Sequence, residues 1–116
     1  MESILTSVKK YIGIAEDDTS FDDDVIMHIN AAFAVLRQLG VGPSTAFRIT
    51  NKFAIWSSFT FDEEVLSMAK SYVYERVKLK FDPPASSAHL QALKESVTES
   101  EWRLTVDAET IYEEEA

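Results

Sequence analysis

Histidines and carboxylates are the residues of this sequence that could bind a metal or transfer protons. His28 and His89 each stand alone, because neither has a second histidine at the spacing that a zinc site on one helix uses. The acidic run EDDTSFDDD at 16–24 lacks the turn glycine and the closing glutamate of a calcium loop. The chain contains no cysteine, which excludes disulfides, thiolate zinc sites and cysteine nucleophiles. We therefore predict no metal site, no cofactor and no enzymatic activity.

Charge is the strongest compositional feature of the chain. Twenty acidic residues against eleven basic ones give a net charge of −9. A protein that binds DNA tightly normally presents a basic surface to the phosphates. The three glycines, at 13, 40 and 42, follow helical patterns and form no phosphate-cradling loop. The composition therefore argues against tight DNA binding.

No apolar run approaches the roughly 20 residues that a membrane-spanning helix needs. The N-terminal stretch has the acidic Glu2 where a secretory signal peptide would be basic. We therefore expect a protein of the cytoplasm that does not enter a membrane.

Four segments with apolar residues at three- and four-residue spacing predict the elements that make up the fold. They cover residues 4–12, 25–39, 65–77 and 90–104. The acidic residues before the second and third segments suit the first turns of helices, where carboxylates meet unpaired N–H groups and the positive end of the helix dipole. The sequence predicts an all-α fold, a small four-helix bundle forming one domain over residues 1–105. The predicted core contains Phe33, Leu36, Val73, Val77, Leu93 and Val97.

The connection between the second and third helices is long and aromatic. Its alternating apolar residues predict either a long loop or a short hairpin. Phe47, Phe53, Trp56 and Phe59 could form an exposed contact surface, or they could cover one end of the bundle. Both interpretations are open at this point.

The end of the chain, residues 106–116, is acidic and predicts an extended tail beside the helical domain. Ile111 and Tyr112 are apolar residues set among glutamates. A segment of this composition is typical of a tail that orders on a partner.

A stiff corner separates the third helix from the fourth. Pro83 and Pro84 lack backbone N–H groups, and each disfavours a helical conformation in the residue before it. The third helix must therefore end by about Phe81, and Asp82 belongs to the corner. Ser86 or Ser87 can then cap the fourth helix.

The stretches YVYERVKLKFDPPASS (72–87) and ALKESVTESEWRL (92–104) flank this corner, and FDDDVIMHINAAFAVLRQLGVGP (21–43) precedes them. Together they resemble the head-tail connector (adaptor, or head-completion) proteins of long-tailed double-stranded DNA phages and prophages. The resemblance implies a structural protein that assembles as a ring of about twelve subunits beneath the portal. Such a ring extends the DNA channel, lets DNA pass without specific binding, and joins the head to stopper or tail-completion proteins.

The same resemblance places the protein in the virion neck, and in the host cytoplasm during assembly. It implies a homo-oligomer with the portal as its partner. We expect the corner Asp82, Pro83 and Pro84 to orient the last two helices. The residues expected at subunit or partner interfaces are Phe47, Phe53, Trp56, Phe59, Arg76, Lys80, Trp102, Arg103, Ile111 and Tyr112.

A second function is compatible with the charge. A phage or prophage can encode an acidic protein that mimics DNA and inhibits a DNA-binding protein. Such a mimic needs carboxylates along one face, whereas lysines at 70, 78, 80 and 94 are mixed into the later helices.

Overall fold

The computed structural model describes residues 2–115, with side chains described for residues 2–109. Its helices are α1 (Ile4–Tyr11), α2 (Asp22–Gln38), α3 (Glu63–Phe81) and α4 (Ser87–Glu115), with a single 3-10 turn, η1 (Trp56–Ser58), before α3. Within the described residues there is no strand, and four α-helices make up the fold. The predicted all-α architecture is confirmed.

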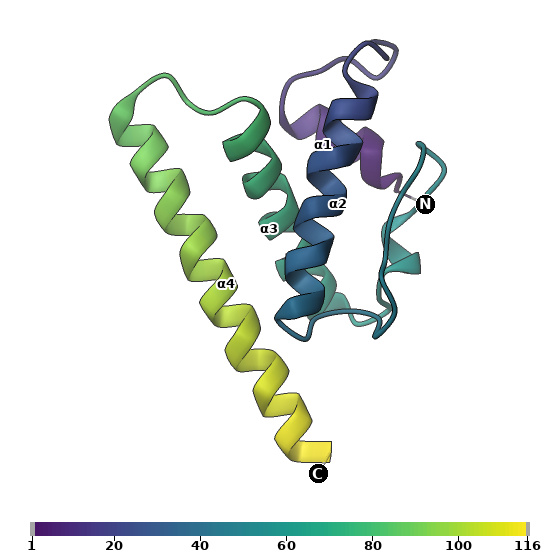
Figure 1. The fold of residues 1–116 in the computed structure, drawn as a ribbon, viewed down its shortest axis with the longest axis vertical. Coiled ribbons are helices and arrows are strands. Elements are labelled where there is room, and N and C mark those ends of the chain that lie inside the picture. The colour runs from purple at the N-terminus through teal and green to yellow at the C-terminus, as the bar shows by residue number, and fades with distance from the viewer. Residues whose placement is uncertain (1, 116) are drawn as a thin grey trace.

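The helices form a layered arrangement in which α3 lies between α2 and α4. The α2–α3 pair makes the centre of the molecule, and α1 packs against both of these helices (Figure 1). Helix α4 packs chiefly on α3 and forms one edge of the subunit, while the connection between α2 and α3 forms the opposite edge.

The helix ends follow the local chemistry that the sequence predicted. Asp62 caps α3, and its Oδ1 accepts hydrogen bonds from the N–H groups of Glu64 at 3.0 Å and Val65 at 3.1 Å. Helix α3 ends at Phe81, directly before the corner. At the start of α4 the hydroxyl of Ser86 accepts from the N–H of His89 at 3.4 Å. Side chains thus cap the starts of α3 and α4. Helix α2 begins after Phe21 without a side-chain cap, so its acidic first turn faces the positive end of the helix dipole without supplying a cap.

One hydrophobic core joins all four helices. Of the predicted core residues, Phe33, Leu36, Val73, Val77 and Val97 are buried, and Leu93 is partly buried at the margin. The helical phase read from the sequence is therefore right for α2, α3 and the first half of α4.

The connection between α2 and α3 is a loop, not a hairpin. Ile55 forms its one isolated bridge with Ser3 from the start of the chain, not with the other half of the connection. The N–H of Ile4 donates to the carbonyl of Ala54 at 3.0 Å, and the indole N–H of Trp56 donates to the hydroxyl of Ser7 at 2.9 Å. The connection is thus tied to α1, and long-range backbone pairing replaces the local pairing of a hairpin.

Helix α4 is longer than the sequence predicted. The apolar pattern ended at Leu104, but the helix continues to Glu115 through the expected start of the tail at residue 106. Ala108 is partly buried against the core, so the first turn of the expected tail packs on the bundle. The side chains of Ile111 and Tyr112 lie outside the described residues.

Candidate assembly surfaces

The aromatic residues of the α2–α3 connection divide into a buried and an exposed group. Trp56 and Phe59 are 2% and 4% exposed, and Phe47 is half-buried against the core. The Phe33 ring lies 4.8 Å from the Phe47 ring and 5.0 Å from the Phe59 ring, between ring centroids. Trp56 and Phe59 therefore belong to the core, which corrects their prediction as interface residues and supports the interpretation in which they cover the bundle.

Close packing around the Phe59 ring explains why residue 42 is a glycine. Gly42 has a φ of +90°, and a Cβ atom built there would lie 2.5 Å from the Phe59 ring. Both the backbone conformation and the space exclude a larger side chain. Gly42 therefore does more than end a helical pattern, because it admits the Phe59 ring.

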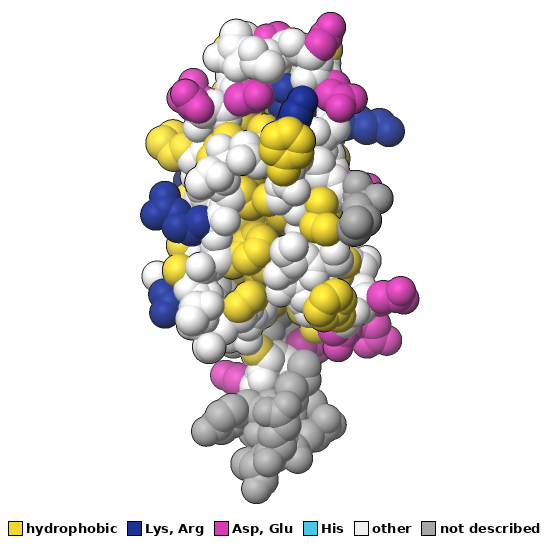
Figure 2. Space-filling view, turned by 90° about the vertical axis from the view of Figure 1, so that its right-hand side faces the viewer, with side chains coloured by type: hydrophobic (Ala, Val, Ile, Leu, Met, Phe, Trp, Pro, Cys, Tyr) yellow, Lys and Arg dark blue, Asp and Glu magenta, His cyan; other side chains and the backbone are white. Residues whose placement is uncertain are grey.

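Two phenylalanines of the same connection point to solvent. Phe53 is 76% exposed, and Phe61, which the sequence analysis did not single out as an interface residue, is 90% exposed. Figure 2 shows the face of the molecule that carries this connection, with apolar side chains gathered in its centre and Lys and Arg side chains along its left edge and near its top. Exposed aromatic side chains on such a face suit a protein–protein contact.

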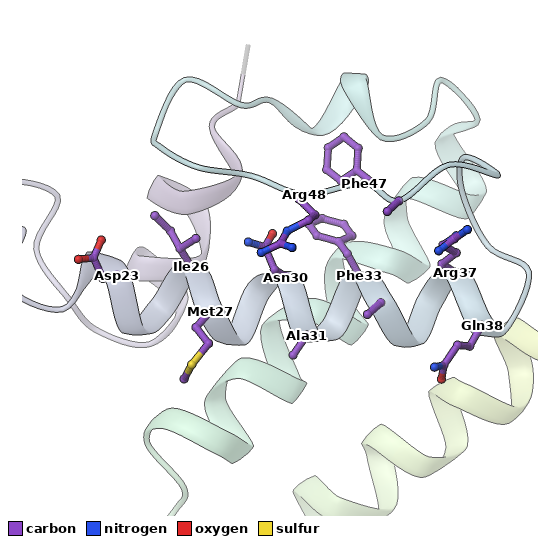
Figure 3. Close-up of a pocket in the computed structure, with 12 residues that line it drawn as sticks. Asp23, Ile26, Met27, Asn30, Ala31, Phe33, Arg37, Gln38, Phe47 and Arg48 are labelled. Atoms are coloured by element: carbon purple, nitrogen blue, oxygen red, sulfur yellow. The ribbon is translucent and has the colours of Figure 1, made fainter.

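A shallow groove runs along the outward side of α2, and we call it the α2 groove. Phe47 and Arg48 of the connection border it on one side, while Met27 and Ala31 lie along the other margin (Figure 3). Its volume is about 780 Å³. The remaining lining residues are Asp23, Ile26, Asn30, Phe33, Ala34, Arg37, Gln38 and Ala46.

Hydrogen bonds hold the wall of the α2 groove in place. The Asn30 side chain accepts from the Ile49 N–H at 2.8 Å and donates to the Ile49 carbonyl at 3.0 Å. The Arg37 Nε donates to the carbonyl of Ser44 at 3.1 Å. Among the described residues neither Arg37 nor Arg48 forms an ion pair, so both guanidinium groups can meet a carboxylate from outside.

The α2 groove was not predicted from the sequence, although a signal existed. Met27, Ala31 and Ala34 follow the helical spacing i, i+4, i+7, on the side of α2 away from its buried residues. A helix that is apolar on two sides normally has a partner on each.

A second surface lies on the side of α4 that faces away from α3, and we call it the α4 outer face. Trp102 is 67% exposed there, and Val106 is 37% exposed. Trp102 stands at one end of a shallow hollow along α4, whose other lining residues are Gln91, Lys94, Glu95, Thr98 and Glu99. A Trp side chain that is two-thirds exposed has the size and chemistry of an interface anchor.

A partly buried polar contact attaches α4 to α3. The Tyr72 hydroxyl donates to Glu101 Oε2 at 2.7 Å, and Arg76 Nη1 lies 3.4 Å from the same oxygen. Burial, followed by the hydrogen bond to Glu101, raises the pKa of Tyr72 well above its ordinary value. Arg76 therefore has a contact inside the subunit, and its expected contact with another subunit stays a prediction.

The other predicted basic residues are on the surface. Lys80 is exposed near the corner, and Arg103 is exposed beside Trp102. Arg103 Nη2 lies 2.7 Å from Glu99 Oε1 one turn earlier in α4. Surface pairs of this kind contribute little to stability, so both residues remain proposals for contacts between proteins.

The corner is held by contacts of the residues just before the prolines. Lys78 Nζ donates to Asp82 Oδ2 at 2.8 Å, at the end of α3. The Phe81 ring meets the Phe21 ring edge-on at 5.7 Å and the His28 ring at 6.2 Å, between centroids. The end of α3 is therefore tied to the start of α2, and His28 has a packing role.

A buried lysine is the structural residue that sequence reasoning missed. Lys9 is 3% exposed, and its ammonium donates to the carbonyls of Glu16 at 3.1 Å and Asp18 at 2.8 Å. The same Nζ lies 2.8 Å from Asp22 Oδ1, an oxygen shielded from solvent. The acidic run at 16–24 thus folds around one internal cation.

Neither a metal centre nor a membrane span is found in the described part of the chain. No group of three or more His, Asp or Glu side chains is placed to hold a metal ion among these residues. None of the described helices is long and apolar enough to cross a membrane.

The fold and these surfaces define a class of protein: a small helical subunit that presents aromatic and apolar contacts on more than one side. A family model described as "Phage connector protein" matches residues 4–110. The chain therefore belongs to the phage connector proteins, the head-tail connector family that its sequence resembles. No curated protein and no solved structure matches it. Membership gives it a structural connector role at the head–tail junction of a phage.

Proposed function

We propose that the protein is a neck subunit that assembles as a ring of about twelve copies beneath the portal. The ring extends the DNA channel and joins the head to a stopper or tail-completion protein. The observation that carries this proposal is the family match over residues 4–110. The α2 groove and the α4 outer face support it, because subunits in a ring need two different surfaces that fit each other.

The charge of the chain suits a channel through which DNA passes without specific binding. A net charge of −9 repels phosphates, so DNA does not adhere to the wall. The same charge would suit a DNA mimic, but the carboxylates here are interrupted by cations. Lys70 pairs with Glu2 at 2.6 Å and Lys78 with Asp82 at 2.8 Å. This mixing favours the connector over the mimic.

Contacts with the portal are assigned to the exposed Phe53 and Phe61 and to the acidic tail at 106–116. In this proposal Ile111 and Tyr112 are the apolar anchors of the tail, and its glutamates meet basic groups on the receiving surface. The rest of the chain, residues 1–105, is the connector domain. The protein acts in the virion neck after assembling in the host cytoplasm.

The test is the mass of the protein by light scattering, alone and mixed with the purified portal of the same phage. We expect the portal complex to gain a mass equal to about twelve subunits. Deleting residues 110–116 is expected to weaken this complex while the helical signal of the free subunit is retained. A full-length protein that never associates with its portal, and that instead inhibits a DNA-binding enzyme, would overturn the proposal in favour of the mimic.

A further inference from the structure

We infer that neighbouring subunits join head to tail by placing the α4 outer face of one copy in the α2 groove of the next, with Trp102 as the anchor. This pairing rests on the proposed ring, and it names the surfaces that form it. It commits the α2 groove to a second copy of this chain.

The apolar parts of the two surfaces fit each other. Trp102 offers a large aromatic side chain that is 67% exposed, and Met27 at the margin of the α2 groove is 59% exposed. The exposed Ala31 and Ala34 leave room along α2 for a large side chain. Burial of an exposed Trp against small residues and a flexible Met is typical of the centre of an interface.

One charge on the α4 outer face is complementary to the α2 groove. The α2 groove carries Arg37 and Arg48, which form no ion pair within the described part of their own subunit. On the α4 outer face Glu99 is already paired with Arg103, and Lys94 adds a positive charge, so Glu95 is the carboxylate that can meet these arginines. Among the described residues, the hydrogen-bond partner of Glu95 is the Gln91 amide at 3.2 Å, so its carboxylate can also accept from an arginine.

The positions of the two surfaces favour a ring over a symmetric dimer. Helix α4 forms one edge of the subunit, and the α2 groove is bordered by the connection that forms the opposite edge (Figure 1). When one copy docks its α4 outer face, its own α2 groove stays free for a third copy. Contacts of this heterologous kind continue until the ring closes.

The chain contains no cysteine, so a disulfide between two of its copies can form only through engineered cysteines. We would introduce Thr98→Cys on the α4 outer face and Ala31→Cys at the α2 groove, each in the full chain. With the portal present, an oxidised mixture of the two single variants should give a disulfide-linked dimer. Each variant alone should give none, and the double variant should give a ladder of covalent oligomers.

The matched control replaces Thr98→Cys by Ser71→Cys, an exposed position of α3 outside both surfaces, and it should give no dimer with Ala31→Cys. A dimer from either single variant alone would show a symmetric contact and overturn the inference. Absence of the mixed dimer while wild-type protein still binds its portal would overturn the pairing and leave the proposed function standing. Failure of the wild type to bind its portal would overturn both.

A second measurement examines the anchor without cross-linking. Trp102→Ala should weaken portal-templated oligomerisation at least about tenfold, and Trp102→Phe should restore part of it. Circular dichroism should show the same helical content in both variants, because Trp102 is on the surface. If the Trp102→Ala variant oligomerises on the portal at the same protein concentrations as the wild type, Trp102 is not the anchor.

Discussion

Replacement of Lys9 by methionine should destabilise the subunit more than any other substitution of a basic residue. The side chain is 3% exposed and its ammonium has three oxygen partners. Methionine keeps most of the apolar stem and removes only the charged end. The change therefore isolates the ammonium from the packing of the methylene groups.

The structure sets the size of the effect. Removing one member of a buried ion pair costs about 3 to 5 kcal/mol when the remaining charge is fully enclosed. Here the Asp22 side chain is 25% exposed, and the carbonyls of Glu16 and Asp18 belong to an exposed loop that water can reach. Partial hydration lowers the expected loss to about 2 to 3 kcal/mol of unfolding free energy.

Urea denaturation followed by circular dichroism measures this loss. A loss of about 2 kcal/mol should lower the midpoint by about 1 M urea. Lys10→Met is the matched control, since Lys10 is exposed on the same helix, and it should change stability by less than about 0.5 kcal/mol. The double variant with Lys9→Met and Asp22→Asn should lose less unfolding free energy than the sum of the losses of the two single variants, because both remove the same ion pair. Equal midpoints for Lys9→Met and Lys10→Met would refute the reasoning.

Three further predictions concern the core, the corner and the contact between α3 and α4. Leu36→Ala should cost about 2 to 4 kcal/mol in the same urea assay while the exposed Met27→Ala costs under about 0.5, and similar losses would contradict the assigned core. Replacing Pro83 and Pro84 together by alanine should leave a helical subunit that no longer assembles on its portal; an unchanged yield would leave the corner as a simple helix stop. The pKa of Tyr72 is higher in the folded protein than in the unfolded chain, where it is about 10. The protonated hydroxyl therefore contributes its full share to the folding free energy below about pH 10, and this share is lost as the pH rises further. Tyr72→Phe should therefore flatten the alkaline fall in stability, and an identical fall in both proteins would exclude this tyrosine as a source.

Periodic patterns and backbone chemistry made the helices predictable. The spacing of apolar residues indicated all four α-helices, and the double proline fixed the end of α3 at Phe81. These signals are local, since they depend on side chains a turn apart or on the missing N–H of proline. The family was predictable for a related reason, because the motif around the corner lies in one continuous stretch.

The surfaces were less predictable, because they depend on contacts between distant parts of the chain. Trp56 is buried since its indole meets Ser7 of α1, and nothing near it in the sequence indicates that partner. The burial of Lys9 likewise depends on a loop that folds back over its ammonium. The α2 groove exists only because the connection packs beside α2. In the sequence alone, the α2 residues that line it are extra apolar positions of one helix, with nothing to indicate a groove.

Helix α4 is held along its length and not only at the proline corner. With 29 residues it is about 43 Å long, and it packs chiefly on α3. Farther along, Ala108 lies beside the turn that follows α2, where a Cβ atom at Gly40 would be 3.4 Å away. Because Val97 and Leu104 belong to the core, a rotation of α4 about the corner would require that core to repack. Helix α4 therefore keeps a constant distance between the corner and the far end of the subunit, as a rigid spacer does.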